Sequence, residues 1–193
     1  MKEIARIVIL VIVLVVLLGL AYPLFTALVA RIDGKTADGD IVYRNGRPVG
    51  AKSIGQRFYS TGFFHGRPSA AGRGYDAMKS GASNVGPSNP RLIKDAKAQI
   101  AKFLKENPGV KVGDIPVEMV TASASGLDPE INVESATLQV QRLSSATGID
   151  ESKLKELIHA HTIGRTLGIF GEPRVNVLEL NLAVLKLSKE AGR

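Results

Sequence analysis

The chain opens with an apolar run that its composition sets apart from everything that follows. From Ile7 to Ala30 the sequence IVILVIVLVVLLGLAYPLFTALVA contains no charged residue. As a helix this run would be about 36 Å long, enough to cross a hydrocarbon core of roughly 30 Å. A single span in lipid must be helical, because every backbone N–H and C=O group needs a partner within the segment. The pattern predicts a short basic tail at residues 1–6 and a transmembrane helix at residues 7–30.

A cleaved signal peptide is the alternative interpretation of this run. The basic N-terminus and the small-x-small sequence Gly19-Leu20-Ala21 fit that pattern. The apolar run continues to Ala30, however, and this length favours an uncleaved anchor. Basic residues flank both ends of the run, and a long following domain can translocate regardless of its charge, so the residues themselves leave the orientation open.

A short apolar run followed by a turn signal predicts a β-hairpin after the span. The apolar stretch IVY at 41–43 leads into Asn45-Gly46, the commonest pair in a two-residue hairpin turn. The return strand is expected from Val49 to Ile54.

The remaining apolar positions predict about four helices and a short strand. The strand is expected in PVEMVTAS at 116–123, because its apolar residues are β-prone and lie in a short run. The helices are marked by polar caps, apolar stripes at helical spacing and Gly or Pro stops. Their expected limits are a cap at Ser88 or Asn89 to a stop at Asn107, Asn132 to Gly148, Asp150 to Gly164, and a last helix starting near Asn176. We therefore predict one soluble α+β domain over residues 31–193.

The composition limits the classes of partner that this domain is expected to bind. The net charge is +7, but the basic residues are dispersed and the chain has only four Tyr and six Phe. A nucleic-acid platform needs aromatic residues interleaved with a basic stripe, so no nucleic-acid partner is predicted. The charge instead suits a surface near anionic lipid or an acidic partner. The absence of cysteine excludes a disulfide framework and a thiolate metal site.

The sequence predicts no catalytic, cofactor-binding or metal-binding residue. No Gly-x-Ser-x-Gly motif occurs. His159 and His161 are two residues apart, a spacing that points them to different faces of a helix. The chain by itself is therefore not expected to be an enzyme.

Three polar, glycine-punctuated segments lie between the predicted core elements. They are FFHGRPSAAG at 63–72, SGASNVGPSNP at 80–90 and VTASASGLDP at 120–129. One interpretation is that their hydroxyls and amides cap their own backbone, as Asn89 or Asp128 would do. The other is recognition of a partner by loops held on a rigid scaffold.

These segments also carry a resemblance to a known family. FHGRPSAA, SGASNVGPSNP, VTASASGLDP, QVQR at 139–142 and EPRVNVLELNLAV at 172–184 follow one another in that order behind a single span. Together they closely resemble the C subunit of the bacterial Kdp potassium-transporting ATPase. The chain departs at Ser53, where the family pattern Gly-Ser-x-Leu-Ile-Gly-Gln leads us to expect a leucine.

The resemblance implies a non-catalytic subunit of an ATP-driven, high-affinity potassium import complex in the inner or plasma membrane. Its implied partners are a channel-like subunit that carries the ion path, a P-type ATPase subunit that hydrolyses ATP, and membrane lipid. ATP, Mg²⁺ and K⁺ are then handled by the complex. The C subunit would stabilise the assembly and act as a catalytic chaperone that raises the ATP affinity of the hydrolysing subunit. Its N-terminus would be cytoplasmic and its domain extracytoplasmic.

We expect the three loops to form the docking surface for the channel-like subunit. A lack of charge suits such a surface, because an unpaired buried charge is costly. The candidate interface residues are His65, Arg67, Ser69, Ser83, Asn84, Asn89, Ser123, Ser125, Asp128, Gln139, Arg142 and Asn176. Two alternatives remain from the residues alone: a membrane-anchored binding module for an anionic envelope polymer, and a secreted hydrolase released by signal cleavage.

Overall fold

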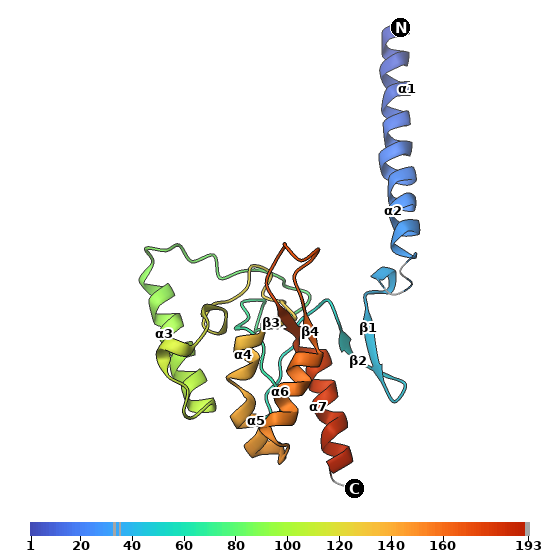
Figure 1. Ribbon diagram of the computed structural model, residues 1–193. Helices are drawn as coiled ribbons and strands as arrows, with labels where there is room; N and C mark the ends of the chain where they lie inside the picture. The colour runs from blue at the N-terminus through green and yellow to red at the C-terminus, as the bar shows by residue number, and fades with distance from the viewer. Residues whose placement is uncertain (33, 35, 192–193) are drawn as a thin grey trace. The chain divides into compact units, whose positions relative to one another are not determined.

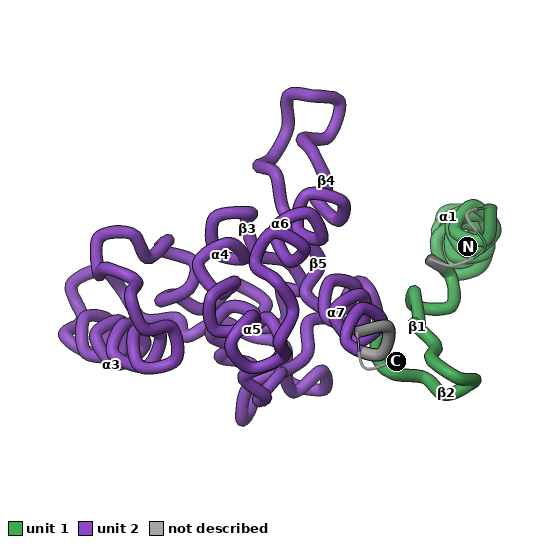
Figure 2. The backbone as a smooth tube through the Cα atoms, turned by 60° about the horizontal axis from the view of Figure 1, so that its bottom comes forward, with its two compact units in different colours: residues 1–51 green, residues 52–193 purple. Residues whose placement is uncertain are grey.

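The computed structural model describes residues 1–32, 34 and 36–191, and these form two compact units. The first unit is Met1–Ala51 and the second is Lys52–Arg193 (Figure 2). The boundary between them follows the predicted hairpin, which groups with the N-terminal helix. A single soluble domain over residues 31–193 therefore stays a prediction.

The N-terminal apolar run is one continuous helix in three parts (Figure 1). These parts are α1 (Lys2–Val16), a π-helical turn η1 (Leu17–Ala21) and α2 (Tyr22–Ala30). The π turn lies just before Pro23, which has no N–H to donate to the preceding turn, and the N–H of Tyr22 donates to the carbonyl of Leu17, five residues back. Among the described residues this is the one helix long and apolar enough to cross a membrane, and its spanning window buries nothing within the chain.

The predicted hairpin is confirmed. A 3₁₀ turn, η2 (Thr36–Asp38), precedes β1 (Ile41–Arg44), which pairs antiparallel with β2 (Arg47–Ala51). Asn45 and Gly46 have φ angles of 52° and 74°. Two consecutive positive φ angles define the turn that this dipeptide favours. The return strand ends at Ala51 and not at Ile54.

The second unit is built around a small antiparallel sheet, and the predicted α+β class is confirmed. The sheet has the order β3-β5-β4, with β3 at Glu130–Asn132, β4 at Thr162–Ile163 and β5 at Arg174–Asn176. Its helices are α3 (Pro90–Glu106), α4 (Val133–Thr137), α5 (Val140–Thr147), α6 (Glu151–Ala160) and α7 (Val177–Ala191). In Figure 1, α4 to α7 lie together on one side of the sheet, while α3 stands at the edge of the unit.

The core of this unit lies between the sheet and the helices α4 to α7. Ile131 and Val175, from adjacent strands, are buried against Leu143, Leu154 and other apolar residues of the helices. Burial of such side chains is the main favourable contribution to folding. Phe64, which comes from a segment without regular structure, is also 0% exposed and belongs to this core.

Two of the three predicted helix caps are confirmed: the side chains of Asn89 and Asn132 accept hydrogen bonds from the backbone of their own first helical turns. Asn176, near which the last helix was expected to start, caps α7 in the same way. Asp150 precedes α6 but makes no capping bond through its side chain.

In the second unit the structure contradicts three predictions of element type or extent. The segment at 116–123 is not a strand: η4 (Val117–Met119) and the preceding η3 (Val112–Asp114) are 3₁₀ turns, and the alternating apolar residues find no neighbouring strand. The helix expected from Asn132 to Gly148 is broken between α4 and α5, where Gln139 turns inward. The helix after Asp150 ends at Ala160, because Thr162 and Ile163 pair with β5 before Gly164 is reached.

Candidate functional site

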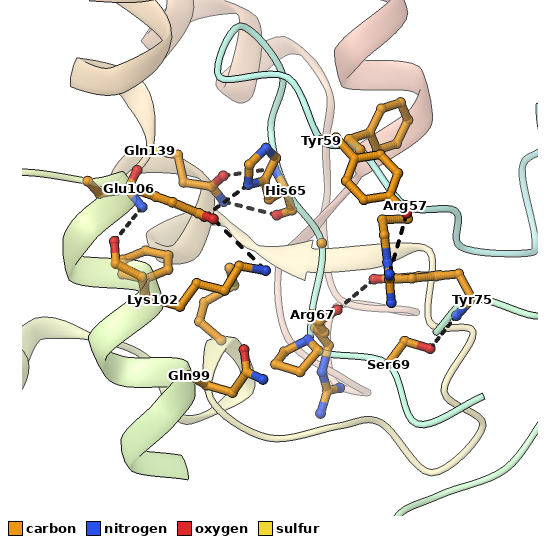
Figure 3. Close-up of a pocket in the computed structure, with 16 residues that line it drawn as sticks. Arg57, Tyr59, His65, Arg67, Ser69, Tyr75, Gln99, Lys102, Glu106 and Gln139 are labelled. Atoms are coloured by element: carbon orange, nitrogen blue, oxygen red, sulfur yellow. Dashed lines mark hydrogen bonds and ion pairs between the residues drawn. The ribbon is translucent and has the colours of Figure 1, made fainter. Parts of the chain in front are cut away.

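A polar hollow of about 350 Å³ lies in the second unit between α3 and the segment 57–75 (Figure 3). Residues of α3, of the 57–75 segment and of the α4–α5 junction face one another across it. The lining residues used below are Arg67, Ser69, Tyr75, His65, Glu106 and Gln139.

The segment on one wall of the hollow is held by amide side chains in place of a neighbouring strand. Asn181, on α7, accepts from the N–H of Phe64 at 2.7 Å and donates to its carbonyl at 2.9 Å. Gln139 accepts from the N–H of His65 at 2.8 Å and donates to its carbonyl at 3.1 Å. Each amide thus supplies the donor and the acceptor that a buried backbone requires. This clamp fixes the start of the 63–72 loop.

Arg142, on α5, adds further hydrogen bonds to the same segment and to Gln139. Its guanidinium donates to the carbonyls of Thr61 and Phe63, to the side-chain oxygen of Asn107 at 3.0 Å and to that of Gln139 at 2.6 Å. Burial lowers the pKa of Arg142 to about 10, and the nearby negative charge of a carboxylate partly opposes this shift. The guanidinium is therefore charged at neutral pH and serves as a structural donor.

His65 connects the clamp to α3. Its Nδ1 lies 3.2 Å from a carboxylate oxygen of Glu106 (Figure 3). Its Nε2 lies 3.0 Å from the carbonyl oxygen of Ser60. Burial lowers the pKa of His65, and the positive charge of Arg142 lowers it further; the Ser60 and Glu106 contacts oppose both effects. These two contacts tie the 57–75 segment to the end of α3, which gives the ring a structural role.

A second set of hydrogen bonds joins the 63–72 loop to the 120–129 loop. Arg67 forms an ion pair of 2.9 Å with Asp128, whose other carboxylate oxygen accepts from the backbone N–H of Glu130. The hydroxyl of Tyr75 donates to the carbonyl of Arg67 at 2.7 Å. Burial, aided by the charge of Asp128, raises the pKa of Tyr75 to about 12. Ser69 accepts from the N–H of Tyr75 and donates to a backbone carbonyl of the 120–129 loop.

All three predicted loops meet at Gly126. This residue has a φ of 66°, and a Cβ atom there would lie 2.6 Å from the backbone N of Ala71 and 2.7 Å from the carbonyl oxygen of Gly81. The N–H of Gly81 donates to the carbonyl of Ser125 at 2.8 Å, which fixes the start of the 80–90 loop. Only glycine fits a site that combines a left-handed backbone with such close contacts.

The twelve candidate interface residues fall into three groups by exposure. Ser123, Gln139, Arg142 and Asn176 are buried, His65, Arg67, Ser69 and Asp128 are half-buried, and Ser83, Asn84, Asn89 and Ser125 are exposed. The bonds of Asn89, Ser125 and Asp128 to nearby backbone N–H groups are those of self-capping loops. Within the buried group, Gln139 and Arg142 hold the start of the 63–72 loop, whereas Asn176 bonds to the carbonyl of Lys52 and caps α7. The exposed group therefore contains the better candidates for contact with a partner.

Sequence reasoning missed several residues that build this cluster. Asn181 gave a usable signal, because it stands inside the apolar run VLELNLAVL of α7, where a polar residue needs a buried partner. Phe64 and Glu106 gave none, since their partners lie 117 and 41 positions away in the sequence.

The described residues contain no group of three or more His, Cys, Asp or Glu side chains placed to hold a metal ion. The polar side chains around the hollow are largely engaged in hydrogen bonds within the unit. The arrangement is thus suited to fixing loops in one conformation.

An apolar helix long enough to cross a membrane, followed by an α+β unit with fixed loops, is the architecture of a membrane-associated protein with one candidate span among its described residues. The family model described as "K⁺-transporting ATPase, c chain", KdpC, matches residues 4–186. The chain belongs to this family, and it is therefore a membrane-associated accessory subunit of the K⁺-transporting ATPase.

Curated relatives agree with this assignment over nearly the full length. The potassium-transporting ATPase KdpC subunit of Caldanaerobacter subterraneus subsp. tengcongensis is 45% identical over 190 residues, covering 98% of this chain and 97% of the relative. The KdpC subunit of Koribacter versatilis is 45% identical over 182 residues, covering 94% and 93%. That of Bacillus cereus strain B4264 is 47% identical over 176 residues, covering 90% of each.

Proposed function

We propose that this subunit stabilises the potassium import complex by docking its three polar loops on the channel-like subunit. The observation that carries the proposal is the convergence of the 63–72, 80–90 and 120–129 loops at Gly126. A surface fixed before binding loses little conformational entropy when a partner binds, so it binds more tightly than a mobile one.

The 80–90 loop supplies the exposed part of this surface. Ser83 and Asn84 are exposed, and the whole loop is free of charge. An interface without charge avoids the cost of burying unpaired ions. It also places no fixed cation beside the potassium path.

The second part of the proposal is the role of catalytic chaperone. In this role the subunit raises the ATP affinity of the P-type ATPase subunit, while ATP, Mg²⁺ and K⁺ are bound by the other subunits. We place the N-terminus in the cytoplasm and the domain outside, so the effect on ATP is transmitted through the assembly as a coupling free energy. The N-terminal helix packs beside membrane helices of the partner and against lipid, which accounts for its apolar surface being unburied within the chain.

The test is co-purification of partner subunits from potassium-starved cells on a C-terminally tagged chain. Ser83→Asp and Asn84→Asp place a charge on the docking loop, and aspartate tolerates the φ of 52° at position 84. Gln141→Glu, on the exposed face of α5, is the matched control. We expect the two loop variants to lose partners and the control to keep them.

The same preparations test the catalytic-chaperone role. Complexes that retain this subunit should show a lower KM for ATP than complexes from which it has been removed. Loop variants that assemble and pump like the parent would overturn the docking proposal. An unchanged KM for ATP after removal of the subunit would overturn the chaperone role.

A further inference from the structure

A second exposed feature lies far along the chain from the three polar loops. Residues 164–173, GRTLGIFGEP, connect β4 to β5, and we name this segment the finger. Figure 2 shows it standing away from the rest of the second unit. Leu167, Ile169 and Phe170 at its tip are 84%, 71% and 64% exposed. Clustered exposed apolar residues of this kind mark interaction sites.

The finger has an ordered structure of its own. Thr166 and Phe170 form an isolated antiparallel bridge, with hydrogen bonds of 2.8 and 3.0 Å between their backbones. Below the bridge, Arg165 forms an ion pair of 2.7 Å with Glu172. The tip is therefore held in a defined turn that presents its apolar side chains outward.

Leu167 adopts a backbone conformation that large apolar residues rarely adopt. Its φ is 55°, in the left-handed region that favours glycine and asparagine. A leucine in this conformation normally gains burial in return, but this side chain is the most exposed of the three. Strain without a compensating contact in the chain points to a contact outside it.

The charge of the finger indicates whether that outside contact is lipid or protein. No charged residue lies between Arg165 and Glu172, and these two neutralise each other. Arg174, at the base of the finger, is likewise paired with Glu130 at 2.6 Å. Segments that bind a membrane surface combine an apolar face of Trp, Phe or Leu with uncompensated Lys or Arg, which attract anionic lipid. The finger has the apolar face but no uncompensated charge, so its neutral tip fits an uncharged hollow on a protein.

We propose that the finger inserts Leu167, Ile169 and Phe170 into an apolar, uncharged pocket on another subunit of the K⁺-transporting ATPase. The proposal rests on membership in this family, and it adds a contact that the three polar loops do not make. Three adjacent large side chains, one of them aromatic, make a typical anchor for a protein interface.

The chain has no cysteine, so one introduced thiol can report on the tip. Phe170→Cys is labelled with a polarity-sensitive fluorophore, and the intact complex is reconstituted in bilayers with and without brominated lipid. Val112→Cys, at a residue that is 58% exposed on the second unit and outside the finger and the three loops, is the control. We expect blue-shifted emission at position 170 in the complex, without quenching by bromine, and water-like emission at position 112. Quenching by brominated lipid would overturn the proposal in favour of a membrane contact, and water-like emission at position 170 would overturn it altogether.

Leu167→Asn separates a role in binding from a role in folding. Asparagine tolerates the left-handed backbone, so the thermal stability of the chain should stay the same or rise. Recovery of partner subunits should fall by about tenfold, as expected for loss of one interface anchor. Recovery equal to that of the parent would overturn the proposal. If the parent itself recovered no partners, the proposed function would fail instead, and the two failures are thus distinguishable.

Discussion

The amide clamp on Phe64 makes a specific prediction for the stability of the second unit. Asn181→Leu keeps a side chain of similar size but removes both hydrogen bonds, at 2.7 and 2.9 Å, to the backbone of Phe64. Phe64 is 0% exposed and Asn181 1% exposed, so water cannot replace the lost partner in the folded state.

The magnitude follows from two opposing effects. Each buried backbone group left without a partner costs about 1–3 kcal/mol, which gives about 4 kcal/mol for two groups. Burial of the apolar leucine side chain offsets about 2 kcal/mol of this. The net loss of about 2 kcal/mol should lower Tm by about 7 °C for a unit of this size.

The assay is thermal unfolding of the purified full-length chain in detergent, with amide hydrogen exchange at Phe64 and His65 as a local measurement. Gln141→Leu makes the same amide-to-leucine change on the exposed face of α5 and should stay within about 0.5 kcal/mol of the parent. If Asn181→Leu and this control have the same Tm, and the amide exchange rate at Phe64 is unchanged, the clamp does not stabilise the unit as argued.

Three further predictions concern pH, the loop junction and a helix cap. The pKa of His65 is lowered below 6.5 in the folded state, so the unfolded chain takes up the proton first as the pH falls. The folded state is therefore most stable above pH 6.5, and its stability declines below that pH. His65→Gln should flatten this decline in Tm, and an equally steep decline in the variant would refute the assignment. Gly126→Ala should lower the free energy of unfolding by at least about 2 kcal/mol, measured by thermal unfolding. Gly148→Ala is the control: its φ is 73° and nothing lies within 4 Å of the added Cβ, so it should cost about 1 kcal/mol. Equal costs would show that the loop contacts at Gly126 are unimportant. Asn132→Ala should cost about 1 kcal/mol and Asp150→Ala, which removes no capping bond, close to none; the reverse order would contradict the cap assignment.

Local sequence signals were sufficient to predict features that depend only on neighbouring residues. The Asn45-Gly46 turn needs only two residues that accept positive φ, and the Asn132 cap needs only an oxygen within reach of the next turn. The strand predicted at 116–123 failed because a strand exists only beside a partner. The short strands β3 to β5 are also too brief to show a period, so only the fold reveals them.

The candidate site was likewise predicted only in part from the sequence. The three loops were recognisable from their glycines and polar residues, but nothing in the sequence joins Gly126 to Ala71 and Gly81. Gln139 and Arg142 were predicted to contact a partner, and the fold places both beneath the 63–72 loop as its support.

The sequence by itself determined the apolar helix, the hairpin, the caps at Asn89 and Asn132, and the family, since each depends on neighbouring residues or on motif order. Only the tertiary structure decided which polar side chains are buried supports and which are exposed, because hydrogen bonds such as Phe64 to Asn181 join residues 117 positions apart. The exposed apolar finger is a tertiary property for the same reason. Leu167, Ile169 and Phe170 are large apolar residues, and only the fold shows that they are exposed.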